Sequence, residues 1–209
     1  MRMSNQGQAG QVITAVTEHQ VAGRDINWWG MIFFIASEAL IFANLIASYL
    51  YLEIRGGSWR LPNGDHLDWR YPLVNTIILL LSSIPVRFAG AGIAKGNRRN
   101  LVIGLTGTII LGAIFLGGQI YEYGSLFGES FTPQTQAFGS AFFTLTGFHG
   151  LHVTIGVIFL LIMLIRSLRG DFTAKNHFGV QAAEMYWHFV DVVWVVVFST
   201  VYLLPLIRG

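Results

Sequence analysis

Long apolar runs dominate the chain, and short polar stretches separate them. Five runs are each about 20 residues or longer, and they cover 28–52, 72–94, 101–123, 137–165 and 182–207. A helix of this length spans the hydrocarbon core of a bilayer, where it satisfies its own backbone hydrogen bonds. The pattern therefore predicts an all-α polytopic membrane protein, a bundle of five transmembrane helices.

The stretches between the runs are rich in turn-forming residues. They include Gly56-Gly57, Pro62-Asn63-Gly64, Lys95-Gly96-Asn97 and Thr132-Pro133. Residues 1–27 are polar, and their one apolar stretch is too short for the core of a signal peptide. We therefore expect a polar N-terminal tail over 1–27 and a five-helix transmembrane domain over 28–209.

Composition agrees with a lipid environment. Of 209 residues, 53% are hydrophobic and 11% are charged, whereas soluble domains carry about 25% charged residues. The chain has no cysteine, which excludes disulfides, iron–sulfur clusters, thiolate zinc sites and cysteine nucleophiles. The net charge of +2 lies in short loops, so it indicates inner-leaflet charge bias and no nucleic-acid partner.

Basic residues are distributed unequally between the two sides of the predicted bundle. The side with the N-terminal tail and the second and fourth connections carries Arg2, Arg24, Lys95, Arg98, Arg99, Arg166, Arg169 and Lys175, and the other side carries Arg55, Arg60, Arg70 and Arg208. Cytoplasmic loops are enriched in Lys and Arg. This bias predicts an N-terminus inside and a C-terminus outside.

Polar residues within the spans are costly, at about 2.5–3.5 kcal/mol for a charge at mid-bilayer, so each needs a partner. Glu38 lies ten positions after Trp28, roughly 15 Å into the first span at about 1.5 Å per residue. His149 lies at a similar depth in the fourth span, and His152 follows three residues later on the same face. The simplest arrangement is a buried Glu–His contact between the first and fourth spans.

A second polar group lies in the inner half of the fifth span. His188 and Asp191 are spaced i, i+3, Trp187 flanks them, and Glu184 lies one turn earlier. Arg87 lies in the inner half of the second span. Its side chain could snorkel to the inner surface or pair with an acid of the fifth span.

Three interpretations compete for these polar residues. His149, His152 and His188 could form a metal or heme site. The Glu, His and Asp side chains could line a proton or transport path, although the chain shows no inverted repeat. They could also fix the registry of helices and subunits as satisfied polar contacts. Soluble-enzyme motifs such as a phosphate-binding loop, His-Glu-x-x-His or Gly-x-Ser-x-Gly are absent from the sequence.

Two stretches of the sequence point to a protein family more specifically than the chemistry of their side chains does. TGFHGLHV at 146–153 and YWHFVDVVW at 186–194 resemble the hallmark segments of cytochrome c oxidase subunit III. Supporting pieces occur in the family's order: Ser37-Glu38, Asn75-Thr76, GQIYEY at 118–123, and His177-Phe178-Gly179. The resemblance covers about residues 28–204.

The resemblance implies a tilted bundle packed directly against the catalytic subunit I, with subunit II and small subunits in the same complex. Family members carry no heme or copper, which belong to subunits I and II. They stabilise the core complex, support proton uptake on the inner side and sustain turnover. Electrons from cytochrome c enter through subunit II, or come from quinol in relatives, and reduce dioxygen elsewhere in the assembly.

The resemblance also assigns residues. Glu38 matches the family's carbodiimide-reactive acid, and the other polar residues match positions within the motifs. The resulting candidates for buried polar or subunit contacts are Glu38, Glu122, His149, His152, Trp187, His188 and Asp191. None is expected to be catalytic, to bind a cofactor or to ligate a metal, and the isolated chain is not expected to be active.

The chain also departs from the family pattern. Long members have seven helices, with lipids held in a cleft between the first two and the other five, and this chain lacks the first two. The lipid-binding residues of that cleft therefore cannot be transferred to this chain, although a bound phospholipid is still compatible with the resemblance. Gln181 replaces a frequent glutamate, and an acid appears at Glu184 instead. We predict subunit III of a proton-translocating cytochrome c oxidase, multi-pass in the bacterial plasma (inner) membrane; the alternatives are a quinol oxidase subunit III or an independent membrane transporter.

Overall fold

The computed structural model describes residues 26–56 and 67–208, and every regular element in these ranges is helical. The five long helices are α2 (Ile26–Gly56), α3 (Arg70–Ala94), α4 (Arg98–Gly128), α5 (Ala137–Arg169) and α6 (Phe178–Phe198). Each is long and apolar enough to cross a membrane, which confirms the prediction of an all-α protein with five spans. Most of the predicted tail and the connection at 57–66 lie outside the described residues.

The chain divides into two units, 1–33 and 34–209. In the first unit, the described residues 26–33 are the opening turns of α2, where the rings of Trp28 and Trp29 meet edge to face at 5.1 Å. All features described below belong to the second unit.

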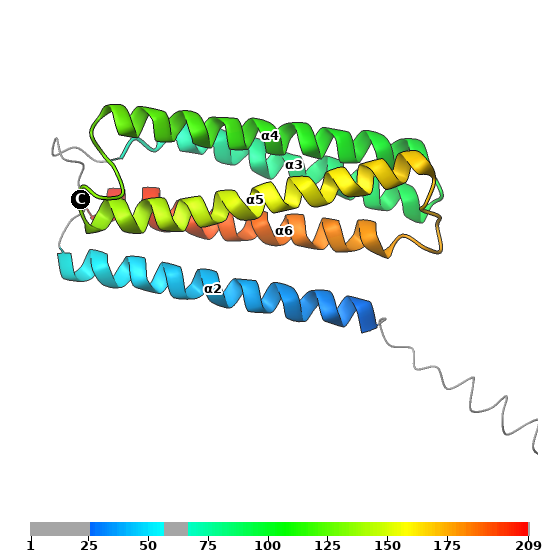
Figure 1. Cartoon of the computed structure of the whole chain (residues 1–209), viewed down its shortest axis with the longest axis horizontal. Helices are drawn as coiled ribbons and strands as arrows, with labels where there is room; N and C mark the ends of the chain where they lie inside the picture. Colours follow the sequence, from blue (N-terminus) through cyan, green and yellow to red (C-terminus); the bar gives the residue numbers. More distant parts are fainter. Residues whose placement is uncertain (1–25, 57–66, 209) are drawn as a thin grey trace, which may run out of the picture. The chain divides into compact units, whose positions relative to one another are not determined.

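Four helices of the second unit form a closed ring of neighbours. Helix α3 packs on α4, α4 on α5, α5 on α6, and α6 packs back on α3 (Figure 1). The interior of this ring is filled by large apolar side chains, which include Leu79, Leu105, Phe115, Phe142, Trp187 and Trp194. Helix α6 has the largest buried share of the five spans, so its side chains determine much of the packing.

The part of α2 in the second unit, residues 34–56, lies beside α5 and α6 and contributes little to the core. Its Phe34 ring stacks on Tyr186 of α6 at 6.2 Å, and its Phe42 ring lies 5.2 Å from Phe148 of α5. Most other side chains of this part are exposed or half-buried. The surface of α2 is therefore the least enclosed of the five helices.

Several helices extend past the apolar runs, because their ends are built from polar residues. Helix α4 begins at Arg98, where the side chain of Asn97 accepts a hydrogen bond from the Asn100 amide at 3.1 Å. The preceding turn requires a left-handed residue, and Gly96 supplies it with a φ of 75°. Gly170 ends α5 in the same way with a φ of 90°.

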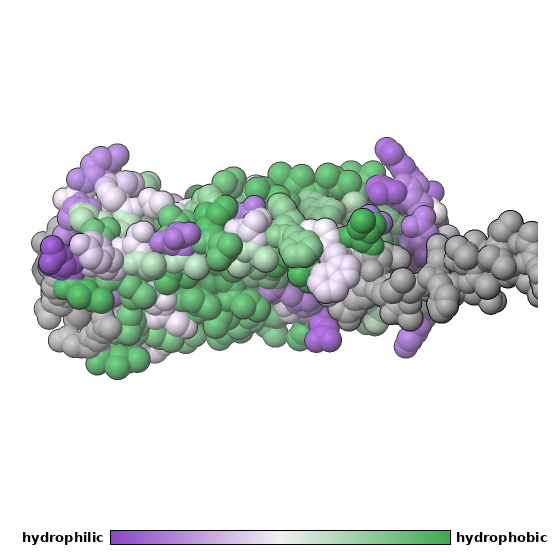
Figure 2. Space-filling view, turned by 90° about the horizontal axis from the view of Figure 1, so that it is seen from below, coloured by the Kyte–Doolittle hydropathy of each residue, from purple (hydrophilic) through white to green (hydrophobic). Residues whose placement is uncertain are grey.

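The last span is not a uniform α-helix, which the sequence pattern did not predict. Helix α6 continues into a π-helical segment, η1 (Ser199–Leu203), and then into the short α7 (Leu204–Arg208). One face of the molecule, seen in Figure 2, is largely hydrophobic along its middle, with hydrophilic side chains towards both ends and a few hydrophilic patches within the hydrophobic band. This distribution fits a bundle whose middle contacts lipid.

Candidate functional site

Glu38 of α2 and His152 of α5 form the contact expected from their depths. His152 Nδ1 lies 2.8 Å from the carbonyl oxygen of Phe148, so this nitrogen carries a hydrogen, because a carbonyl oxygen only accepts. His152 Nε2 lies 3.0 Å from Glu38 Oε2. A hydrogen bond at this distance needs one proton between the two atoms, on either the imidazole or the carboxyl group.

This pair carries no net charge in either arrangement. A neutral imidazole facing a carboxylic acid and an imidazolium facing a carboxylate both sum to zero. The pair therefore avoids the large cost of an isolated charge in a low-dielectric environment. Its geometry is that of a satisfied polar contact between helices, and it can also hold a transferable proton.

His149 lies one turn before His152, but its surroundings are aromatic. Its ring stacks on Trp194 at 4.6 Å and meets Phe115 edge to face at 5.8 Å. The side chain is fully buried, and among the described residues neither ring nitrogen has a hydrogen-bond partner. His149 therefore packs as an aromatic core residue beside Trp194.

Two buried tryptophans join α6 to α3 through hydrogen bonds. Trp187 Nε1 donates to Ser82 Oγ at 2.8 Å, and Trp194 Nε1 donates to Thr76 Oγ1 at 2.9 Å. The hydroxyl of Thr76 in turn donates to the carbonyl oxygen of Pro72 at 2.7 Å. Each large ring thus occupies the core with its polar atom satisfied.

A chain of hydrogen bonds links α6 to Ser83 of α3. The hydroxyl of Ser83 donates to Asp191 Oδ2 and lies 3.1 Å from His188 Nδ1. Because the hydroxyl hydrogen is used on Asp191, the Nδ1 of His188 donates to Ser83. Glu184 Oε1 lies 3.8 Å from the other ring nitrogen of His188. The predicted i, i+3 pair is therefore bridged by a serine of the neighbouring helix.

Glu122 lies at the opposite end of the bundle, near the end of α4. Its Oε1 accepts a hydrogen bond from the hydroxyl of Tyr202 at 2.7 Å. Tyr202 belongs to the π-helical segment η1, which follows α6 in the last span. Next to Glu122, Tyr123 is 2.7 Å from the hydroxyl of Thr146.

The structure separates the candidate residues into distinct sites. His149, His152, Trp187 and Asp191 are buried, whereas Glu38, Glu122 and His188 are half-buried. The three histidines proposed for a metal site have different neighbours, which are aromatic rings, Glu38 and Ser83. Within 26–56 and 67–208, no three His, Asp or Glu side chains converge in a way that could hold a metal ion.

Sequence reasoning missed the partners of Trp187, His188, Asp191 and Glu122. Ser82 and Ser83 form hydrogen bonds with side chains of α6, and the hydroxyl of Tyr202 donates to Glu122. The adjacent serines inside an apolar span were a usable signal, because polar side chains in a membrane helix seek partners on other helices. The Tyr202 contact had no comparable signal, because the π-helical segment that holds Tyr202 left no mark in the hydrophobic pattern.

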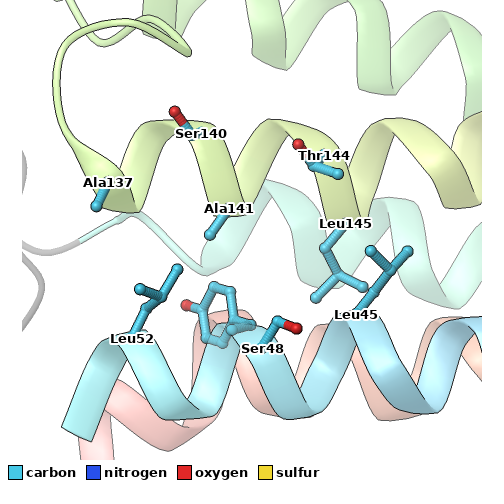
Figure 3. A pocket seen from close by; sticks show the side chains of 9 residues that line it. Leu45, Ser48, Leu52, Ala137, Ser140, Ala141, Thr144 and Leu145 are labelled. Atoms are coloured by element: carbon cyan, nitrogen blue, oxygen red, sulfur yellow. The ribbon is translucent and has the colours of Figure 1, made fainter. Parts of the chain in front are cut away.

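An apolar groove of about 360 Å³ lies between α2 and the first turns of α5. Its lining residues are Leu45, Ser48, Tyr49, Leu52, Ala137, Ser140, Ala141, Thr144 and Leu145. Leu45 and Leu145 point towards one another, while the hydroxyls of Ser140 and Thr144 lie on the side of α5 away from α2 (Figure 3). The lining includes no charged residue, so the groove suits hydrocarbon and provides no metal ligand.

Replacing Glu38 tests the polar contact with His152. We expect Glu38→Ala to lower the free energy of unfolding by about 1 kcal/mol, the size typical of hydrogen bonds between membrane helices. Glu38→Gln should lose less, because its amide can still bond to His152 Nε2. Unfolding of the purified chain in detergent micelles by titration with a denaturing detergent measures both changes.

Ser37→Ala is the matched control. Its hydroxyl donates to the carbonyl oxygen of Phe34 within α2, at 2.7 Å, and its removal should leave stability nearly unchanged. Equal losses for Ser37→Ala and Glu38→Ala would contradict a stabilising role for the Glu38–His152 contact.

Comparison with known proteins gives consistent matches along the chain. The family model described as "Cytochrome c oxidase subunit III" matches residues 10–205. A relative from Thermostichus vulcanus named cytochrome c oxidase subunit 3 is 39% identical over 188 residues, covering 90% of this chain and 92% of its own length. Relatives of the same name from Synechocystis and Equus caballus are each 41% identical over 181 residues, covering 86% and 83% of this chain and 76% and 68% of their own lengths.

Proposed function

The chain belongs to the cytochrome c oxidase subunit III family, and from this membership we propose that it serves as subunit III of a proton-translocating cytochrome c oxidase in aerobic respiration. The observation that carries the proposal is the extent of the match, which runs from residue 10 to residue 205. In this role the chain transfers no electrons. The hemes and copper of the complex lie in subunits I and II.

The role of the chain in this complex is to stabilise the catalytic subunit I and to support proton uptake and sustained turnover. Two features favour a structural contribution. Both partners of the Glu38–His152 contact belong to this chain, and the indole N–H groups of two α6 tryptophans donate to hydroxyl groups of α3. Helices α3, α4 and α5 each continue without interruption from end to end, unlike the broken helices at the centre of many transporters.

We place the protein in the bacterial plasma membrane with the N-terminus inside. The connections at 95–97 and 170–177 lie at one end of the bundle, and the basic residues beside them are Lys95, Arg98, Arg99, Arg166, Arg169 and Lys175. We call this the basic end. Basic loops remain on the cytoplasmic side, so the basic end faces the cytoplasm.

Cytochrome c is the electron donor in this proposal, and it acts through subunit II. The alternative is a quinol oxidase with the same subunit III architecture. The names of the relatives from Thermostichus vulcanus and Synechocystis, both cytochrome c oxidase subunit 3, favour cytochrome c.

Purification of the tagged chain from its native membranes tests the function. We expect a heme-bearing catalytic subunit to co-purify with it in a stoichiometric amount. The purified complex should oxidise reduced cytochrome c in the presence of dioxygen. Activity with quinol and none with cytochrome c would select the alternative donor. A chain that purifies without any heme protein, and that transports a solute when reconstituted alone, would refute the proposal.

A further inference from the structure

Polar side chains reach the outer surface of the bundle along the seam between α3 and α6. Arg87 of α3 is exposed, and the side chains of Glu184 and His188 of α6 keep 24% and 34% of their surface. Ser83 and Asp191 lie beneath them in the hydrogen-bonded chain described above. We call Arg87, Glu184 and His188 the α3/α6 polar face.

This face lies in the half of the membrane-spanning region nearer the basic end. At about 1.5 Å per residue, Glu184 and His188 lie roughly 9 and 15 Å along α6 from its first residue, Phe178. Arg87 lies seven residues before Ala94, the last residue of α3, which is roughly 10 Å from the same end. Glu184 lies against Gly90 of α3, so the two helices match in depth at this point.

Lipid cannot satisfy these groups. The long side chain of Arg87 can turn towards the basic end, but those of Glu184 and His188 are too short to leave their depth. Within the chain, His188 bonds to Ser83 and lies near Glu184, but the outward surface of both side chains still faces hydrocarbon, where exposed polar groups are costly. Among the described residues, no acid lies within ion-pair distance of the Arg87 guanidinium, so its N–H donors are not used by an ion pair there.

Other outward surfaces of the bundle are different. Large side chains exposed along the middle of α4 and α5 are mostly aliphatic, as in Ile103, Ile110, Ile114, Ile155, Ile158 and Ile162. Such surfaces suit lipid contact. The contrast distinguishes the α3/α6 seam from the α4 and α5 surfaces as a place for protein contact.

We propose that the α3/α6 polar face docks on a transmembrane helix of the catalytic subunit, and that a hydrogen-bond acceptor on that helix pairs with Arg87. The assignment rests on the proposed function, which supplies the partner. Charge complementarity selects the acceptor, because a guanidinium has five donors and no acceptor. Polar side chains between membrane helices then stabilise the pair of subunits.

Site-specific photo-crosslinking in native membranes tests the face. A photoreactive residue replaces Val192 of α6, which is 64% exposed beside His188, or Ile158 of α5 or Ile110 of α4, which are 51% and 53% exposed. We expect position 192 to form an adduct with the catalytic subunit, and positions 158 and 110 to label lipid.

The outcomes separate the docking face from the function. The docking assignment alone would be overturned if position 158 or 110 formed the adduct with the catalytic subunit while position 192 labelled lipid or a second copy of this chain. Absence of any heme-bearing subunit from the membranes that contain the chain would overturn the proposed function and the docking assignment together.

Charge removal tests the role of Arg87. We expect Arg87→Leu to weaken retention of the chain in the solubilised complex by about tenfold in dissociation constant, the effect of losing one charge-assisted hydrogen bond. Arg87→Lys should retain part of the affinity. The control Arg99→Leu removes an equal charge from an exposed position in the first turn of α4. Equal retention for Arg87→Leu and Arg99→Leu would overturn the pairing of Arg87 with the partner.

Discussion

Trp187→Ala is expected to lower the free energy of unfolding by about 3–5 kcal/mol, the range found when a buried tryptophan is truncated in a core. The indole of Trp187 is fully buried and packs directly against two glycines. A β-carbon added at Gly112 of α4 would lie 2.6 Å from the ring, and one at Gly156 of α5 would lie 3.0 Å from it. Truncation removes contacts with both helices and leaves a cavity that they cannot close.

Two further variants separate packing from hydrogen bonding. Trp187→Phe keeps most of the ring but loses the hydrogen bond to Ser82, so it should fall between the wild type and Trp187→Ala. Val192→Ala is the control, because Val192 is 64% exposed on the same helix. Detergent unfolding monitored by circular dichroism measures all three. A loss for Trp187→Ala no larger than for Val192→Ala would show that α6 does not organise the core.

Gly104→Ala is expected to lower the free energy of unfolding by about 1–3 kcal/mol, as overpacking does in other cores. A β-carbon at Gly104 of α4 would lie 2.8 Å from the amide nitrogen of Ala89 and closer still to the carbonyl oxygen of Pro85. Both atoms belong to the backbone of α3, so no side-chain rotation can relieve the overlap. The two helices must move apart instead.

Gly117→Ala is the matched control for this variant. Gly117 lies in the same helix, and an added β-carbon would meet nothing within 4 Å. Alanine favours helical backbone over glycine by about 0.5–1 kcal/mol, so Gly117→Ala should leave stability unchanged or raise it. The same unfolding titration compares the two variants. A similar loss at both positions would contradict close packing of α3 on α4 at Gly104.

Much of the fold follows from residue order alone. The apolar runs predicted five spans: the first four correspond to the single helices α2 to α5, and the fifth covers α6, η1 and α7. Their ends were predicted less well. Helix α4 begins three residues before the predicted 101, and α6 begins four residues before the predicted 182, because a helix can continue into polar residues beyond the hydrocarbon. The π-helical segment η1 left no sign in the hydrophobic pattern.

The candidate site could be predicted from the sequence only where the depth of a residue in the membrane was enough to identify its partner. Distance along a membrane helix gives depth directly, so Glu38 was matched with the pair His149 and His152. The structure selects His152, whose Nε2 lies 3.0 Å from Glu38 Oε2. Depth gives no information on helix rotation. For that reason the link of His188 and Asp191 to Ser83, and the aromatic surroundings of His149, appeared only in the structure.

The sequence by itself determined that the chain crosses a membrane five times, because the hydrophobicity and length of a segment decide whether lipid accepts it. It also determined the family, through segments such as 146–153 and 186–194. Tertiary structure alone decided which side chains of neighbouring spans touch and which polar groups face outward. That choice depends on how each helix is rotated and how closely glycines such as Gly104 and Gly112 let helices approach, and packing between distant segments sets both.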